Sequence, residues 1–207
     1  MRTRTWQCIA IALVVPLAGA TVMAQESGKS GAPGDSAAMA AMMEAMLKYS
    51  TPGPEHKFLE KLTGHWTGDL KMWMDPAAPP TETKGTSHRE MLLGGRWLKE
   101  DVHSDFMGQP FTGMWLVGYD NFRQRFVSLW MDDMSTGTML SYGTLDTTGT
   151  VLTCSGTMDD PATGEKDKKF RSVLRVTGPD AHVEEMYSTI PGQGEVKVME
   201  IHYTRAK

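Results

Sequence analysis

The chain has little cysteine and none of the common catalytic fingerprints. Of its two cysteines, Cys8 lies in an N-terminal segment that we expect to be removed, so the mature chain can form no internal disulfide. Cys154 lies in a strand-like stretch, which predicts a small buried hydrophobe rather than a reactive thiol. The sequence has no Gly-x-Ser-x-Gly, phosphate-binding loop or dinucleotide motif. This excludes the commonest hydrolase, kinase and dehydrogenase signatures.

Basic residues are also fewer than acidic residues. The chain carries 21 basic and 25 acidic residues, a formal net charge of -4. Arg2 and Arg4 would leave with the N-terminal segment, making the mature chain still more acidic. This balance argues against nucleic acids and anionic membranes as partners. No later apolar run is long enough to cross a bilayer, so we expect no membrane insertion.

Residues 1–24 read as a signal peptide. Arg2 and Arg4 supply the positive start, Cys8 to Leu17 form an apolar stretch too short to span a membrane, and small residues precede a cleavage site after Ala24. We therefore predict an exported protein, periplasmic or secreted. Its oligomeric state is not indicated by the sequence.

Residues 25–36 are rich in Gly, Ser, Ala and Pro and predict a disordered linker. Residues 37–62 predict short helices before the main domain. Four methionines recur at helical spacing in the first of them, which favours packing against a core, with Cu(I) binding by thioethers as the alternative: Met39, Met42, Met43 and Met46. Pro54 suits the start of a second short helix, whose apolar side should lid or flank one end of the domain.

Residues 63–207 predict a mainly β domain. Ten segments of strand character are separated by turn signals, which indicates a single ten-stranded antiparallel up-and-down β-barrel. Gly94-Gly95 predicts a two-residue hairpin. The segments are 65–74, 85–93, 96–104, 111–118, 125–132, 138–145, 150–157, 168–176, 182–188 and 196–205.

Several motifs, spaced in one order from Pro52 to the C-terminus, carry a resemblance to a known family. They are Thr63-Gly64-His65-Trp66-Thr67-Gly68, Met91 to Leu98, Phe111-Thr112-Gly113, Gly118 to Asn121, Trp130-Met131-Asp132 and Tyr203-Thr204-Arg205. The chain resembles domain-of-unknown-function family 1579. That resemblance implies a barrel fold and no established activity.

A looser resemblance links the chain to the calycin superfamily. Its members open on Gly-x-Trp and often pack that Trp against a basic residue of the last strand, which implies that Trp66 and Arg205 meet where the barrel closes. The chain also resembles nitrobindin, a haem-binding relative with Gly-x-Trp-x-Gly-x-Gly, but Leu70 stands where the third glycine belongs. We therefore expect no cofactor, with haem and Cu(I) as alternatives.

A closed barrel places candidate function in its interior. Aromatic and charged residues in the strands are the candidate ligand-binding set: Glu90, Glu100, Trp115, Trp130, Tyr142, Arg171, Glu185 and Tyr187. Charges inside a barrel persist only when paired, which predicts a buried charged network.

Two pairs at i and i+2 on strands offer nitrogen and oxygen to a metal, His88 with Glu90 and Glu200 with His202. No His-x-His or His-Glu-x-x-His spacing occurs, so we predict no metal site and expect these pairs to form salt bridges on the barrel wall instead.

Three functions remain open. The preferred hypothesis is a binding protein for a small apolar or amphipathic molecule. The alternatives are an enzyme that uses interior carboxylates and a filled barrel that serves as a scaffold. A solid interior would exclude ligand and substrate, whereas a cavity with two carboxylates of separated pKa would favour chemistry.

Overall fold

The computed structural model describes residues 33–161, 163–190 and 192–207. The predicted signal peptide and residues 25–32 of the predicted linker lie outside the described residues. Backbone contacts divide the chain into a unit that ends at Ala41 and a unit that runs from Met42 to Lys207. The second unit contains the barrel.

Helix α1 spans Pro33–Ser50, so residues 33–36 are helical where the sequence predicted linker. The expectation that its methionines pack against a core was wrong. The side chains of Met42, Met43 and Met46 are between 51% and 59% exposed. An Ala-rich helix needs no such packing locally, because Ala and Met both have high helix propensity. None of the described helices has the length and apolar character needed to cross a membrane.

Helix α2 spans Pro54–Glu60 and closes one end of the barrel. Pro54 takes the first helical turn, where its missing N–H costs nothing. The Gly53 N–H donates to His56 Nδ1 at 3.0 Å, which satisfies the start of the helix. Phe58 and Leu59 are buried against the barrel interior, as the predicted lid requires.

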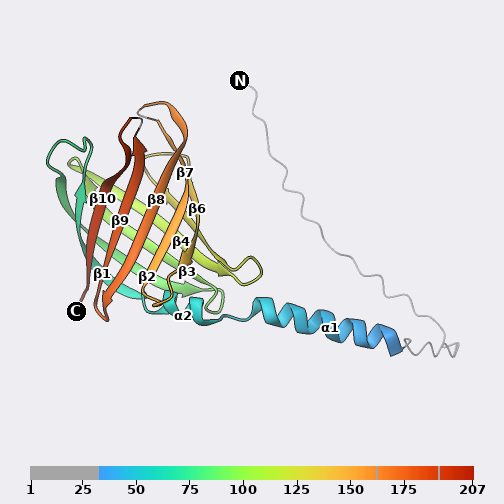
Figure 1. The fold of residues 1–207 in the computed structure, drawn as a ribbon. Helices are drawn as coiled ribbons and strands as arrows, with labels where there is room; N and C mark the ends of the chain where they lie inside the picture. The colour runs from blue at the N-terminus through green and yellow to red at the C-terminus, as the bar shows by residue number, and fades with distance from the viewer. Residues whose placement is uncertain (1–32, 162, 191) are drawn as a thin grey trace, which may run out of the picture. The chain divides into compact units, whose positions relative to one another are not determined.

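Ten antiparallel strands form a closed barrel in which each strand pairs with its sequence neighbours and β1 also pairs with β10 (Figure 1). The predicted mainly β, ten-stranded up-and-down barrel is confirmed. The strands are β1 (Gly64–Met72), β2 (Thr81–Leu92), β3 (Trp97–Phe106), β4 (Gln109–Asp120), β5 (Arg125–Asp132), β6 (Met139–Leu145), β7 (Val151–Asp160), β8 (Glu165–Gly178), β9 (Ala181–Ile190) and β10 (Gly194–Arg205).

The seam between β1 and β10 places Trp66 opposite Arg205. The Arg205 guanidinium lies 4.1 Å from the centre of the indole ring. It also donates to the backbone carbonyls of Thr63 and Lys61, at 2.5 and 3.1 Å, and to the Asp180 carboxylate at 2.9 Å. One side chain therefore ties the last strand to the chain segment that enters the first.

The connection at Gly94-Gly95 is longer than the two-residue hairpin that the sequence indicated. Strands β2 and β3 are joined by four residues, 93–96, because Leu93 adopts positive φ together with Gly94 and Gly95. Two-residue connections lie between β8 and β9, at residues 179–180, and between β3 and β4, where Met107 and Gly108 have φ of 53° and 80°. Positive φ at both central residues matches the twist of a two-residue hairpin.

The barrel interior is filled at the α2 end and hollow toward the other end. Beside α2, buried apolar side chains form a contiguous core: Phe58, Leu59, Leu62, Leu98, Val117, Phe126, Leu152, Cys154 and Leu174. Above this core the chain places a buried charged cluster, followed by a cavity.

Candidate functional site

A cavity of about 440 Å³ occupies the part of the barrel away from α2, where β1 ends at Met72. This volume falls in the range of roughly 300 to 1,000 Å³ that is typical of small-molecule sites. Its lining is mostly apolar and aromatic, and includes Leu70, Val102, Phe106, Phe111, Trp115, Trp130, Phe170 and Ile201. The interior is therefore not packed solid.

Methionines form one side of the cavity wall. Met72 on β1 pairs in register with Met199 on β10, and Met199 pairs with Met186 on β9, so three thioethers lie side by side facing inward. Met74 and Met134, from the connecting loops, also line the cavity. Because Met is unbranched and polarizable, such a wall can adapt to ligands of different shape.

The aromatic side of the wall is held rigidly. Trp130 donates from its indole N–H to the Asp132 carboxylate at 2.8 Å and stacks on Phe111 at 6.3 Å between ring centres. Its ring lies directly over Gly113, where an added Cβ would collide with it. Glycine at 113 thus makes room for the indole, and Trp130 presents a fixed aromatic surface.

A second tryptophan lies deeper in the cavity. The indole N–H of Trp115 donates to the Ser128 hydroxyl at 2.7 Å, so its polar atom is satisfied within the wall. Ser141 on β6 and Ser172 on β8 also line the cavity. Hydroxyls at these positions can exchange hydrogen bonds with a ligand, since each both donates and accepts.

The end of the cavity nearest the core beside α2, called its floor here, is built around a buried arginine. Arg89 is 1% exposed and donates to Glu184 Oε1 at 2.6 Å, and its Nη2 lies 2.8 Å from Glu100 Oε1. Its Nη1 contacts His182 Nε2 at 2.8 Å, and its guanidinium lies 4.8 Å from the centre of the Tyr203 ring. Four strands, β2, β3, β9 and β10, therefore meet at one charge. A buried cation persists only with such partners.

The two carboxylates that flank Arg89 differ in environment. Glu100 is 2% exposed, and burial raises its pKa even though Arg89 opposes this. Its Oε1 also accepts from the Ser87 hydroxyl at 2.5 Å. Glu184 is also penalised by burial, but the charge of Arg89 lowers its pKa. The pKa values of the two carboxyl groups are therefore shifted in opposite directions.

The remaining titratable groups near the floor are held neutral. Burial lowers the pKa of His182, and Arg89 acts in the same direction. Burial and the two nearby carboxylates raise the pKa of Tyr203. Burial also raises the pKa of the Cys154 thiol to about 12, which agrees with the small buried hydrophobe that the sequence predicted.

The structure brings together only part of the predicted ligand-binding set. Glu100, Trp115 and Trp130 line the cavity. Glu185 borders it, but its carboxylate pairs with Lys197 at 3.3 Å. These four come from β3, β4, β5 and β9.

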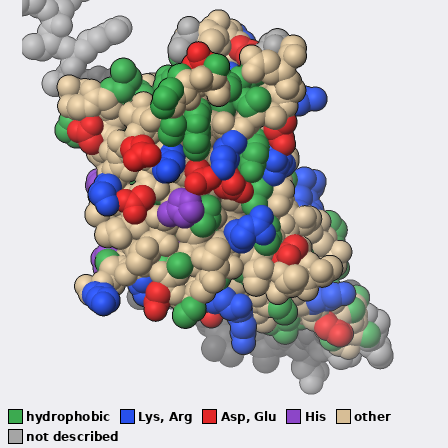
Figure 2. Space-filling view, turned by 60° about the vertical axis from the view of Figure 1, so that its left-hand side comes forward, with side chains coloured by type: hydrophobic (Ala, Val, Ile, Leu, Met, Phe, Trp, Pro, Cys, Tyr) green, Lys and Arg blue, Asp and Glu red, His purple; other side chains and the backbone are tan. Residues whose placement is uncertain are grey.

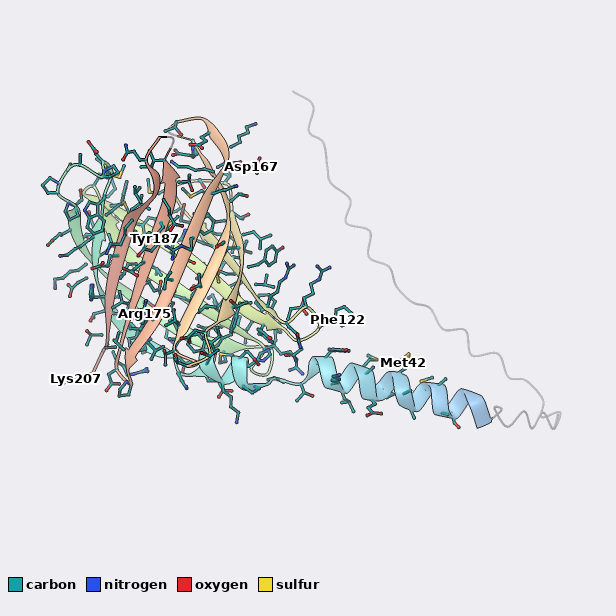
Figure 3. The ribbon with its side chains drawn as sticks, viewed as in Figure 1. Met42, Phe122, Asp167, Arg175, Tyr187 and Lys207 are labelled. Carbon is teal, nitrogen blue, oxygen red and sulfur yellow. The ribbon has the colours of Figure 1, made fainter. Side chains whose placement is uncertain are left out.

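The other predicted residues face outward, so their expected interior placement was wrong. Glu90 is exposed and Tyr142 is 39% exposed. Arg125 covers the ring of Tyr142 from 3.6 Å. Arg171 similarly covers Tyr187, which lies about midway along the outer wall (Figure 3), and pairs with Glu195 across 2.6 Å. Guanidinium groups thus shield these aromatic rings from water, which allows tyrosine to occupy an outer face.

The two pairs considered as metal ligands also belong to the outer wall. His88 stacks on His65 with ring centres 4.4 Å apart. His202 contacts Glu200 at 2.7 Å, and Lys197 also pairs with Glu200. In the described part of the chain, no three His, Cys, Asp or Glu side chains are grouped to hold a metal. Figure 2 shows charges of both signs interspersed over this side of the barrel.

Sequence reasoning missed Arg89, His182 and Glu184. Arg89 and Glu184 are each one residue away from a position that it weighed, Glu90 and Glu185, and a one-residue shift moves a strand side chain to the other face. His182 shares the inward face of β9 with Glu184, two residues further along. The alternation Ser87, Arg89, Met91 could have indicated the inward face of β2. Polar residues at inward positions hid that signal.

Comparisons with known proteins agree with this architecture. The family model described as "Protein of unknown function (DUF1579)" matches residues 51–205. The chain belongs to this family. The matched part begins just before α2 and ends with β10, so DUF1579 covers the barrel and its lid.

Among solved structures, the chain is similar to Rv2717c from M. tuberculosis, with a TM-score of 0.55 and 15% identity over 76% of this chain and 100% of that one. It is also similar to a redesigned β-barrel, with a TM-score of 0.39 and 14% identity over 72% of this chain and 95% of that one. No curated protein matches it. The likeness to Rv2717c concerns the fold alone.

Proposed function

We propose that this DUF1579 protein binds a small amphipathic molecule in the barrel cavity after export. The observation that carries the proposal is a hollow of about 440 Å³ with apolar walls and a polar floor inside a closed barrel. At the roughly 30 Å³ that a water occupies in the liquid, it holds about fifteen non-hydrogen atoms. A ligand of about this many atoms would bury most of its surface in the cavity.

The wall combines rigid and adaptable parts. Trp130 is fixed by Asp132, Phe111 and the absence of a side chain at Gly113. The methionines opposite are free to repack. This combination supports a site that accepts a class of molecules rather than a single shape.

Calorimetric titration with decan-1-ol tests the proposal. Val102 lines the cavity, whereas His103 on the same strand is exposed. We expect saturable binding of one molecule per chain to the native protein, abolished by Val102→Trp and retained by His103→Trp. Circular dichroism and urea unfolding establish that both variants fold. Absence of saturable binding to the native protein, or equal binding to both variants, contradicts the proposal.

An enzyme that uses interior carboxylates is the second candidate. It is favoured by one observation: Glu100 and Glu184 share the cavity floor while their pKa values are pushed in opposite directions. Mass spectrometry of an added ester or amide amphiphile, after incubation with native protein and with Glu100→Gln, separates the two functions. Recovery of the unchanged compound from the native protein favours binding, and Glu100-dependent conversion favours catalysis.

A further inference from the structure

The charges that face the cavity have one sign. The described residues that line it include Glu100, Asp132 and Glu184 but no lysine, arginine or histidine. Asp105 and Glu185 also border it. A ligand carboxylate or phosphate needs a cation or several donors to replace its water. An anionic head group entering this cavity would instead approach carboxylates.

Arg89 does not supply the missing cation. It lies behind the carboxylates, is fully buried, and is not part of the cavity lining. Its terminal nitrogens are already within 2.8 Å of Glu100, Glu184 and His182. Its guanidinium is thus committed to holding the floor together.

The floor is therefore short of positive charge. One guanidinium faces two carboxylates, and the neighbouring His182 is buried in contact with that guanidinium. The groups that face the two carboxylates from adjoining strands are Ser87 and Arg89 on β2, His182 on β9 and Tyr203 on β10. Arg89 carries the fixed positive charge among these. An added cation would balance the second carboxylate.

We propose that the ligand is a cationic amphiphile, whose protonated amine lies against Glu184 and Glu100 and whose apolar part lies among the methionines and tryptophans. This inference rests on the proposed function and names its substrate class. An ammonium group offers three donors to carboxylate and hydroxyl oxygens at the floor. Trp115 and Tyr203 line the cavity beside the same floor, and both rings also face the Arg89 guanidinium, at 5.7 and 4.8 Å.

Three ligands with the same alkyl chain test the proposal: decylamine, decan-1-ol and decanoic acid. Near neutral pH the amine is protonated and the acid is ionised. Calorimetric titration of the full-length protein, below the solubility limit of each compound, should give the tightest binding for the amine. We expect at least about tenfold preference over the acid, which corresponds to one charge-assisted hydrogen bond. Val102→Trp should abolish the amine signal.

A matched pair of carboxamide variants tests whether the amine binds at the cavity floor. Glu184→Gln keeps the shape of the side chain and should weaken decylamine binding by about tenfold while leaving decan-1-ol binding unchanged. Glu195→Gln, on the outer wall against Arg171, should change neither. The comparison of the three ligands with the native protein needs no variant, so a Glu184→Gln protein that fails to fold leaves the test intact.

The outcomes separate this inference from the proposed function. If decan-1-ol binds in the cavity but the amine binds no tighter than the acid, the cationic ligand class is wrong and the binding function stands. If amine binding survives Val102→Trp, the amine binds elsewhere and the inference is also overturned. If none of the three compounds binds saturably, the proposed function fails with it.

Discussion

Replacing Arg89 by methionine removes the guanidinium that pairs with both Glu100 and Glu184. Methionine fills the space of the aliphatic part of the arginine side chain, so the change removes the guanidinium with its charge and hydrogen bonds. Both carboxylates then lie without a cation beside buried Tyr203 and His182. The perturbation asks whether the charged cluster holds the barrel together at its centre.

The expected loss is large. Removing one partner of a buried ion pair destabilises a protein by about 3–5 kcal/mol, because the other charge is left uncompensated. A domain of this kind has about 5–15 kcal/mol of unfolding free energy in total. Arg89→Met should therefore remove a substantial fraction of the stability, measured as a lower urea midpoint with an unchanged slope.

The pH dependence of that loss is specific to the carboxylates. In the native protein Glu184 has a lowered pKa, so its contribution to stability is present above its unfolded value of 4.5 and is lost as pH falls. In Arg89→Met both carboxyls favour their protons in the folded state, which penalises folding at neutral pH. The difference between the two proteins should be largest near pH 7 and narrow below about pH 4.5.

Arg171→Met is the matched control. Arg171 pairs with Glu195 through side chains that are 30% and 45% exposed, so its loss should cost less than about 1 kcal/mol. A loss below about 1 kcal/mol for Arg89→Met would refute the reasoning. So would a loss that does not change between pH 4 and pH 7.

Three other results are expected. Arg205→Ala should lower the unfolding free energy by about 1–3 kcal/mol, because the variant lacks the contact with the Trp66 indole and the charged hydrogen bonds to backbone carbonyls. Unchanged urea unfolding would contradict a stabilising role of Arg205 at the β1–β10 seam. Gly113→Ala should displace Trp130 and cost about 1–3 kcal/mol, with altered near-ultraviolet circular dichroism; Gly137→Ala, where a Cβ meets only ordinary contact, should leave that spectrum intact. Cys154 should resist a thiol reagent near pH 8 until the protein unfolds, and rapid labelling of the native protein would show that its thiol is accessible.

The fold was predictable because its signals are local. Turn residues recur between short alternating segments. Near the start of the first strand, Trp66 pairs with Arg205 of the last strand, as the resemblance to calycins implied. Strand β5 matches its predicted limits, residues 125–132. The prediction of a two-residue hairpin at Gly94-Gly95 was wrong because Leu93 also has positive φ. The leucine side chain disfavours this conformation, and the local sequence does not signal it.

The site was less predictable because it depends on which face of each strand points inward. Glu100, Trp115 and Trp130 were placed correctly inside. Tyr142 and Tyr187 suggested inward faces, yet each is covered from outside by an arginine. Pairing between distant strands decides this, and the contact of Arg89 with Glu184 joins residues 95 apart in the chain.

Nuclear magnetic resonance of the protein with ¹³C-labelled methionine methyl groups tests the central claim most directly. During titration with decylamine, the methyl signals of Met72, Met186 and Met199 in the cavity wall should shift together and saturate. Those of Met42 and Met46 on the exposed helix α1 should stay in place. Shifts confined to the helix, or shifts of all methionines without saturation, would contradict a binding cavity inside the barrel.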